Sequence, residues 1–308
     1  MINIYEIFLE KITSFGIFGF LTVATIVYFL FKYTRRDQDF SEVGLRIRTW
    51  WVMIGLLFLA MTTHIIASLA FFALVSFLAL KEFFSMIPTR KADRVVLGMA
   101  YLVIPITYYV IYIQWYGFYI VLIPVYAFLY FPMLMVLVGE TEGFLKAVGT
   151  IQWGMMTTVF CISHGAYLLV LPEEPNPQAG GVGLLLFLLI LTQLNDVAQF
   201  LWGKTLGRTK VAPKVSPGKT WEGLVGGVLT TAGLAFLLAP FLTPLSPLHA
   251  VLTGLMIGIP GFIGDITMSA IKRDIRIKDS GDILPGHGGI LDRIDSLIFT
   301  APLYFHYV

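Results

Sequence analysis

The chain has little charge and almost no cysteine. Only 13% of its 308 residues are charged, whereas soluble domains carry roughly a quarter. The single cysteine, Cys161, excludes an internal disulfide and any cysteine-based metal cluster, so we expect a small buried side chain there. The N-terminus lacks a basic segment followed by a small-residue cleavage site, and we therefore expect no removable signal peptide.

Long apolar runs take the place of the missing charge. Apolar residues make up 57% of the chain, and the mean hydropathy is +0.81. The runs are continuous rather than alternating, which favours helices over barrel strands. We predict an all-α, polytopic integral membrane protein with about ten transmembrane helices. The expected spans are 12–33, 49–65, 67–86, 94–113, 117–138, 147–171, 179–202, 221–242, 249–272 and 292–308.

The basic residues are distributed unevenly over the loops between these spans. Twenty of the 21 lysines and arginines fall in five alternate loops, and only Lys11 falls elsewhere. Basic loops stay on the cytoplasmic side of a membrane. The sequence therefore predicts a cytoplasmic face made of these five loops, with both termini and the loop LPEEPNPQAGG outside. The localisation we expect is a bacterial inner (plasma) membrane.

The two halves of the chain differ in where their polar residues lie. Residues 1–150 keep polar side chains in loops, and we expect this part to form a lipid groove or a dimer scaffold. Residues 151–308 also place polar side chains inside spans. Because polar groups within a membrane are costly and usually functional, we expect the second half to be the catalytic domain.

The first candidate constellation is TQLNDVAQFLWGKTLG, residues 192–207. Asn195 and Asp196 lie within a predicted span, and Asp196 is eight residues before Lys204. That spacing is about 12 Å along a helix, so Asp196 should lie near the cytoplasmic end. The competing interpretation is a structural ion pair with a basic residue of a neighbouring loop.

The second constellation is GKTLGRTKVAPKVSPGKTWEG, residues 203–223. The ending SPGKT looks like a P-loop, but Pro213 stands where that motif needs glycine, and no strand is expected before it. Glycine, basic side chains and hydroxyls still suit a polyphosphate. The alternative is an ordinary basic loop that binds anionic lipid. The candidate phosphate contacts here are Lys204, Lys214, Ser216, Lys219 and Thr220.

The third constellation runs from Asp265 to Asp295. Asp265, Ser269 and Lys272 form one polar stripe on a helix, and Asp292 and Asp295 share a face where the next helix begins. One aspartate there would be an ordinary helix cap. Four carboxylates at one depth, including Asp196, would repel each other without a cation. Carboxylate ligands suit Mg²⁺, which also binds substrate phosphates.

Other histidines give no functional signal and are expected to pack in the core or at the interface. His287 differs because it lies in the glycine loop GHGG, where phosphate contact and a structural role are equally open.

The segment SAIKRDIRIKDSGDILPGHGGILDRID, residues 269–295, resembles the signature of the phosphatidate cytidylyltransferase (CDP-diacylglycerol synthase) family. The match covers every specified position, including Ser269, Lys272, Arg273, Lys278, Asp279, His287, Gly288, Gly289, Asp292, Arg293 and Asp295. The upstream SPGKTWEG segment also looks like the nucleotide-binding part of that family. The resemblance covers about residues 190–300. With the phosphate contacts named above, the candidate substrate contacts are Asn195, Asp196, Ser269, Lys278, Asp279, His287, Gly288, Gly289 and Arg293.

The resemblance implies that CTP and phosphatidic acid react to give CDP-diacylglycerol and pyrophosphate. It implies metal ligands at Asp265, Asp292 and Asp295, phosphate contacts at Lys219, Lys272, Arg273 and Lys278, and often a homodimer. It also implies two metal ions, Mg²⁺ and a second ion such as K⁺. The attacking lipid phosphate is already anionic at neutral pH, so no general base is needed. We expect CTP, phosphatidic acid and membrane lipids as partners, and no nucleic acid.

Two alternatives remain open at this point. The chain could act on a different lipid phosphate or be a CTP-dependent lipid kinase, because its N-terminal half matches no motif. A transporter of phosphorylated solutes would need polar residues through the full membrane depth, whereas here they gather on one side.

Overall fold

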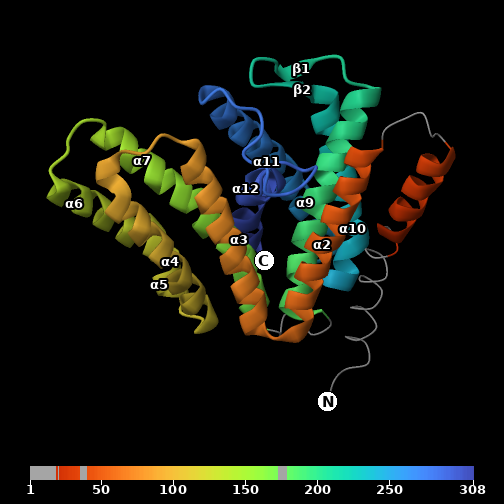
Figure 1. Ribbon diagram of the computed structural model, residues 1–308. Helices are drawn as coiled ribbons and strands as arrows, with labels where there is room; N and C mark the ends of the chain where they lie inside the picture. Colours follow the sequence, from red (N-terminus) through yellow and green to blue (C-terminus); the bar gives the residue numbers. More distant parts are fainter. Residues whose placement is uncertain (1–18, 20, 35–39, 173–178) are drawn as a thin grey trace.

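A computed structural model describes residues 19, 21–34, 40–172 and 179–308. Lys11, Arg35, Arg36 and most of the loop LPEEPNPQAGG lie outside the described residues. Where the chain is described, it consists of helices, one short β-hairpin and connecting loops (Figure 1). The predicted all-α architecture is confirmed.

Among the described residues, eight helical segments are long and apolar enough to cross a membrane, and each overlaps a predicted span, although Ser41–Thr63 begins well before the predicted 49–65. The other two predicted spans, 12–33 and 292–308, correspond to the described helix at 21–34 and to the 17-residue last helix. The helical elements are α2 (Ser41–Thr63), α3 (Ile65–Met86), α4 (Arg94–Tyr112), α5 (Tyr116–Val121), η2 (Leu122–Ala127), α6 (Phe128–Val138), α7 (Phe144–Met155), η3 (Met156–Cys161), α8 (Ile162–Tyr167), η4 (Leu168–Val170), α9 (Gly180–Thr205), α10 (Trp221–Leu242), α11 (Pro247–Asp274) and α12 (Leu291–Tyr307). Two of them, η2 and η3, are π-helical turns inside longer spans.

Helix boundaries follow local chemistry. His64 is extended, and its Nδ1 accepts a hydrogen bond from the Ile66 amide at 3.2 Å, which separates α2 from α3. Thr220 caps α10 by accepting from the Gly223 amide at 3.1 Å. Ser246 precedes Pro247 at the start of α11, the usual pairing of a cap residue with an N-terminal proline.

Hydrogen bonds join several of the five loops that were predicted to share one side. Arg46 Nε donates to the Gly286 carbonyl at 3.0 Å, joining the first and fifth loops. Arg273 Nε donates to the Val215 carbonyl at 3.4 Å, joining the fifth and fourth. Arg90 Nη1 donates to the Glu140 carbonyl at 3.3 Å, joining the second and third.

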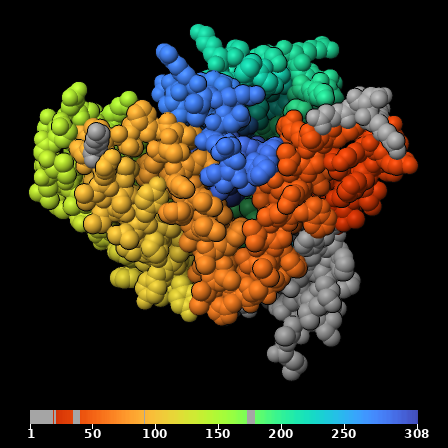
Figure 2. All heavy atoms as spheres, viewed as in Figure 1, coloured from red at the N-terminus to blue at the C-terminus, as the bar shows by residue number. Residues whose placement is uncertain are grey.

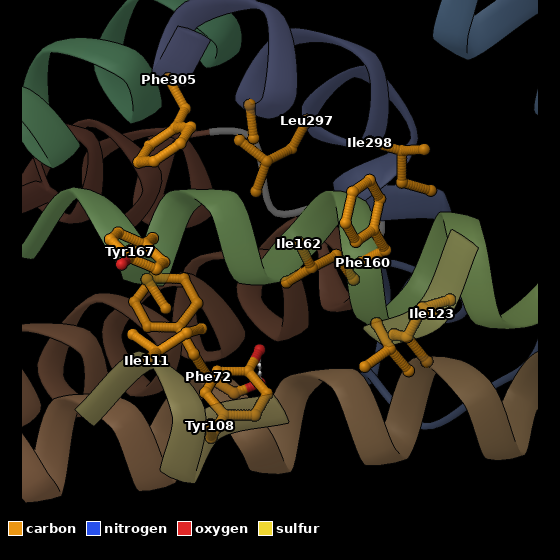
Figure 3. Close-up of a cluster of buried hydrophobic side chains, with 14 of the residues drawn as sticks. Phe72, Tyr108, Ile111, Ile123, Phe160, Ile162, Tyr167, Leu297, Ile298 and Phe305 are labelled. Carbon is orange, nitrogen blue, oxygen red and sulfur yellow. Dashed lines mark hydrogen bonds between the residues drawn. The ribbon is translucent and has the colours of Figure 1, made fainter. Parts of the chain in front are cut away.

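The sequence-distant halves share one apolar core. Figure 3 shows Phe305 and Leu297 of α12 facing the same cluster as Phe160 of η3 and Tyr108 of α4. In the second half, α9 packs on α10, α11 and α12, and α11 packs on α10 and α12. One apolar core therefore includes residues from both halves of the chain.

The segment after α9 contains structure that the sequence analysis did not anticipate. Strands β1 (Lys210–Ala212) and β2 (Ser216–Thr220) form an antiparallel hairpin with a register irregularity between Lys210 and Ala212. A strand therefore does precede the SPGKT stretch, and our expectation of none was wrong. SPGKT is itself strand β2, so it is no loop cradling a phosphate between a strand and a helix.

Candidate catalytic site

Three helices bring three aspartates together near the end of the bundle where the basic loops meet. Asp196 lies on α9, Asp265 on α11 and Asp295 on α12. Both Asp196 and Asp265 act electrostatically on Asp295. The approach of α11 to α12 is close, since a side chain at Gly264 would collide with the Asp295 carbonyl oxygen. Asp196 and Asp265 are thus charged neighbours of Asp295, and the metal-ligand roles predicted for these carboxylates stay predictions.

Lys219 at the end of β2 reaches this group. Its Nζ forms an ion pair with Asp265 and lies 3.3 Å from Gln199 Oε1. The ammonium group also lies 5.5 Å from the centre of the Phe262 ring. Ser269 Oγ donates to Asp265 Oδ1 at 3.4 Å, so the predicted polar stripe of α11 begins as expected. The hairpin thus places the ammonium group of Lys219 next to Asp265.

Asp292 forms a separate pair with Lys272. Lys272 Nζ lies 2.6 Å from Asp292 Oδ1, and the two side chains are only 12% and 7% exposed. Asp292 Oδ2 accepts from the amides of Ser280 at 2.9 Å and Gly289 at 3.1 Å. Both oxygens of Asp292 are therefore engaged by the protein, and its predicted metal-ligand role stays a prediction.

Ser296 ties α12 to α9 next to these pairs. Its Oγ lies 2.9 Å and 3.1 Å from the two oxygens of Asp196. Asp295 Oδ1 accepts from the Ser296 amide at 2.8 Å. Among the described residues, Asp295 forms no ion pair of its own. Its carboxylate thus faces two others of like charge without a bonded cation.

The glycine loop contacts the N-terminal half of α2, a contact that the sequence did not predict. Thr49 Oγ1 donates to the Pro285 carbonyl at 2.8 Å, and the rings of Trp50 and His287 meet edge to face with centres 5.9 Å apart. Gly286 and Gly288 have φ values of +76° and +81°, which glycine adopts without strain. In Figure 2 the blue segment after α11 lies between orange N-terminal helices, above a hollow in the surface.

His287 is a half-buried ring in this loop. Burial, and then the charges of Arg293 and Arg46, hold its pKa below the ordinary histidine value. Its Nδ1 has no hydrogen-bond partner within the described structure. A neutral ring packed on Trp50 supports the structural interpretation as well as it supports phosphate contact.

Two predicted substrate contacts are engaged in helix packing. Asn195 is fully buried: its Nδ2 donates to the Gly258 carbonyl at 3.3 Å, and its Oδ1 accepts from Thr231 Oγ1 at 3.0 Å. Thr220 is the buried cap of α10. Their substrate contacts remain predictions.

The remaining candidates are exposed or partly exposed. Arg273 lies at the end of α11, where its guanidinium also bonds the Ile277 carbonyl at 3.2 Å. Lys204 is exposed on α9, and its Nζ lies 5.9 Å from the centre of the Phe200 ring. The exposed or partly exposed candidates of the hairpin, the loop between α11 and α12, and the start of α12 are Lys214, Ser216, Lys278, Asp279 and Arg293.

Of two further polar side chains near the site, the sequence places Gln199 on the same helix face as Asp196 without a predicted role, and it gave no prediction for Glu82. Gln199 is 3% exposed, shares a helix with Asp196, and leaves its Nε2 without a partner in the described part of the chain. Glu82 is also 3% exposed and lies in the predicted span 67–86. The available signal was a lone acidic residue within a span, which is costly unless it is paired.

The chemistry of the site fits a hard divalent cation. The three neighbouring acidic groups are carboxylates, and in the described residues the ion pair formed with them joins Lys219 to Asp265. Within the described residues, no three acidic, histidine or cysteine side chains converge on a single metal position. Mg²⁺ does not require such a cage, because it commonly binds one or two carboxylates together with waters and substrate phosphates.

The comparisons with known proteins identify the family. The model of the cytidylyltransferase family matches residues 44–308, which is most of the chain. The chain belongs to the cytidylyltransferase family. The match includes every candidate residue described above and most of the N-terminal helices, so the family extends beyond the segment 190–300 that resembled its signature.

Individual relatives match over different lengths. An uncharacterized protein, YnbB of Escherichia coli (strain K12), is 49% identical over 95% of this chain and 96% of its own. The phosphatidate cytidylyltransferase of Haemophilus influenzae is 40% identical over 49% of this chain and 54% of its own. That of Bacillus subtilis (strain 168) is 40% identical over 43% of this chain and 50% of its own. The chain thus spans about half the length of these curated enzymes.

Proposed function

We propose that this membrane protein transfers the CMP group of CTP to phosphatidic acid, giving CDP-diacylglycerol and pyrophosphate. The observation that carries the proposal is the convergence of Asp196, Asp265 and Asp295 beside Lys219 where the basic loops meet. The names of the family and of the relatives matched over half their length supply the substrate class.

The reaction is a displacement at phosphorus. A phosphate oxygen of the lipid forms a bond to the α-phosphorus of CTP, and the bond between that phosphorus and the oxygen bridging to the β-phosphate breaks. The electron pair leaves with pyrophosphate, so no proton transfer is required. The barrier is the repulsion between two anions, and catalysis consists of neutralising charge and aligning the reacting groups.

The basic side chains suit that task. Lys219 and Lys272 are each held by an aspartate in the described structure, so their positions are fixed before substrate binds. Arg273 is held at the end of α11 by the hairpin carbonyl of Val215. We assign Lys219, Lys272 and Arg273 to the phosphates of CTP and the lipid, with Lys278 as a further contact.

We further propose that Mg²⁺ binds at Asp196, Asp265 and Asp295, with Asp292 as an additional ligand, and that a second ion such as K⁺ is accommodated. When bound, Mg²⁺ would neutralise charge on the phosphates. Asp196, Asp265 and Asp295 lie on three helices, α9, α11 and α12, that pack together. The positions of their carboxylates are therefore set by the packing of these helices.

The basic end of the bundle would face the cytoplasm of a bacterium, with the protein in the inner membrane. CTP would arrive from the cytosol, and the lipid phosphate would arrive at headgroup depth. The hollow beside α2 and α3 in Figure 2 offers an approach for the lipid. A homodimer, with the first 150 residues as scaffold or lipid groove, completes the proposal.

A product assay tests the proposal. Purified protein in detergent is incubated with Mg²⁺, phosphatidic acid and CTP labelled at either the α- or the γ-phosphate. Cytidylyl transfer moves only the α-label into lipid and releases pyrophosphate, whereas a lipid kinase moves only the γ-label.

The lipid acceptor is tested in the same assay, because the relative that matches nearly the whole chain is itself uncharacterized. Phosphatidic acid is compared with other lipid phosphates at equal surface concentration. The α-label entering another lipid phosphate but not phosphatidic acid would contradict the proposed substrate while keeping the reaction type.

A further inference from the structure

Glu82 is a buried acidic residue of the N-terminal helices whose hydrogen bonds go to the catalytic half. It lies in α3, about 200 residues before its partners in the chain, and is 3% exposed. A buried carboxylate without partners would be strongly unfavourable. Its contacts therefore explain why it is tolerated there.

The partners of Glu82 are the free amides at the start of α12. Glu82 Oε2 accepts from the Ile290 amide at 2.8 Å, and Oε1 accepts from the Leu291 amide at 3.0 Å. The Ser280 hydroxyl also donates to Oε1. Residue 290 provides no side-chain cap for α12. Glu82 thus satisfies the first amides of a helix from another part of the chain and places a negative charge at its positive end.

The contact between Glu82 and the start of α12 also explains why residue 289 is glycine. A side chain there would collide with the Glu82 carboxylate and the Ser280 hydroxyl. Gly289 therefore has a packing reason of its own, apart from the phosphate contact predicted for it. The loop is built so that the Glu82 carboxylate can approach the backbone.

Asp292 also binds the backbone next to the amides that Glu82 binds. Asp292 accepts from the amides of Ser280 and Gly289, while Glu82 binds the Ser280 hydroxyl and the next two amides. The two carboxylates therefore hold one piece of backbone between them. Asp292 also bonds Lys272 at 2.6 Å, so a shift of the segment would move that pair.

We propose that Glu82 is a positioning residue of the catalytic site. It fixes the start of α12, and with it the positions of Asp292, Asp295 and Lys272. This inference rests on the proposed function for its effect on turnover, although its structural part does not. It also gives the N-terminal half a direct part in assembling the site.

The test compares Glu82→Gln and Glu82→Asp with Glu142→Gln as the matched control, because Glu142 is an exposed glutamate at the same end of the bundle. Glutamine would turn an N–H group toward backbone donors. Aspartate keeps the charge but is one methylene shorter. We expect Glu82→Gln to lower kcat about 100-fold and raise the Mg²⁺ concentration for half-maximal rate, because a misplacement of about 1 Å can have such an effect.

The recovery of kcat in Glu82→Asp distinguishes a positioning role of Glu82 from a contribution to stability alone. Glu82→Asp should recover at least about tenfold of the lost kcat, and Glu142→Gln should match the wild type. If Glu82→Gln loses thermal stability while kcat and the Mg²⁺ requirement of the folded fraction stay at wild-type values, the residue is merely structural and the inference is wrong.

A second measurement needs neither substrate nor activity. Hydrogen exchange of the amides at 288–292 should speed up by about tenfold or more in Glu82→Gln but not in Glu142→Gln. Unchanged exchange there would overturn the inference. A wild-type protein that makes no CDP-lipid would overturn the proposed function alone, since exchange still reports the contact.

If Glu82→Gln does not fold, Ser280→Ala removes one donor to Glu82 and leaves the carboxylate in place. Faster exchange at 288–292 with a lower kcat supports the inference. Wild-type exchange and kcat in this variant would contradict it.

Discussion

Replacing Asp292 by asparagine should destabilise the protein, whereas the same replacement of Asp295 should not. Asp292→Asn removes the charge that pairs with Lys272 and turns an N–H group toward either the ammonium or two backbone amides. Breaking a buried ion pair by removing one partner costs about 3–5 kcal/mol. Asp295→Asn removes a charge that faces Asp196 and Asp265, so without metal it should cost little or even stabilise.

The magnitude is large enough to measure. Taking the lower value of about 3 kcal/mol, and about 2–4 °C per kcal/mol for a chain of this size, Asp292→Asn should lower Tm by about 6 °C or more. Asp295→Asn should leave Tm within about 2 °C of the wild type, or raise it, in a chelator-treated sample.

The assay is thermal unfolding of both variants and the wild type in one detergent, followed by tryptophan fluorescence. Both variants should lose activity, so activity alone does not distinguish them. Equal decreases of Tm in the two variants would refute the reasoning, because they would show that Asp292 and Asp295 have the same electrostatic surroundings.

Three further outcomes follow from the described contacts. Lys219→Met should reduce turnover at least about 100-fold because it removes the cation beside Asp265, whereas Lys204→Met should stay within about threefold, as measured in the CTP assay; equal losses would contradict the assignment. Asn195→Ala should lower the free energy of unfolding by about 1–3 kcal/mol by leaving buried polar groups unpaired, which a Tm measurement checks against wild type. Because the folded-state pKa of His287 is lowered, the unfolded chain binds its proton first as pH falls below about 6.5, and stability is lost on acidification. The decrease in Tm between about pH 7.5 and about pH 5.5 should therefore be smaller in His287→Gln, and an equal decrease would show that this ring does not titrate as inferred.

Much of the fold could be predicted because the membrane makes strict demands on sequence. A span must be apolar and helical, so the runs behind α3 and α10 were placed within two residues of their observed ends. The membrane also constrains the basic loops, because charge avoids the membrane interior, and contacts of Arg46, Arg90 and Arg273 join several of them. The β1–β2 hairpin was missed because three to five residues rich in lysine and proline carry no strand pattern.

The candidate site was predictable where spacing along one helix decides the outcome. Asp265 and Ser269 share a face by helical period alone, and the structure joins them. Contacts between distant helices could not be predicted in this way. The pairing of Lys272 with Asp292, and that of Glu82 with the start of α12, depend on how helices pack, which no single-sequence pattern reports.

The most direct test of the central claim is transfer of the α-phosphate label of CTP to phosphatidic acid in the presence of Mg²⁺, by wild-type protein and by Asp295→Asn. The account predicts labelled CDP-diacylglycerol and pyrophosphate from the wild type, and none above background from a variant with an unchanged Tm. Wild-type turnover in folded Asp295→Asn would contradict the assignment of the three converging aspartates as the catalytic site.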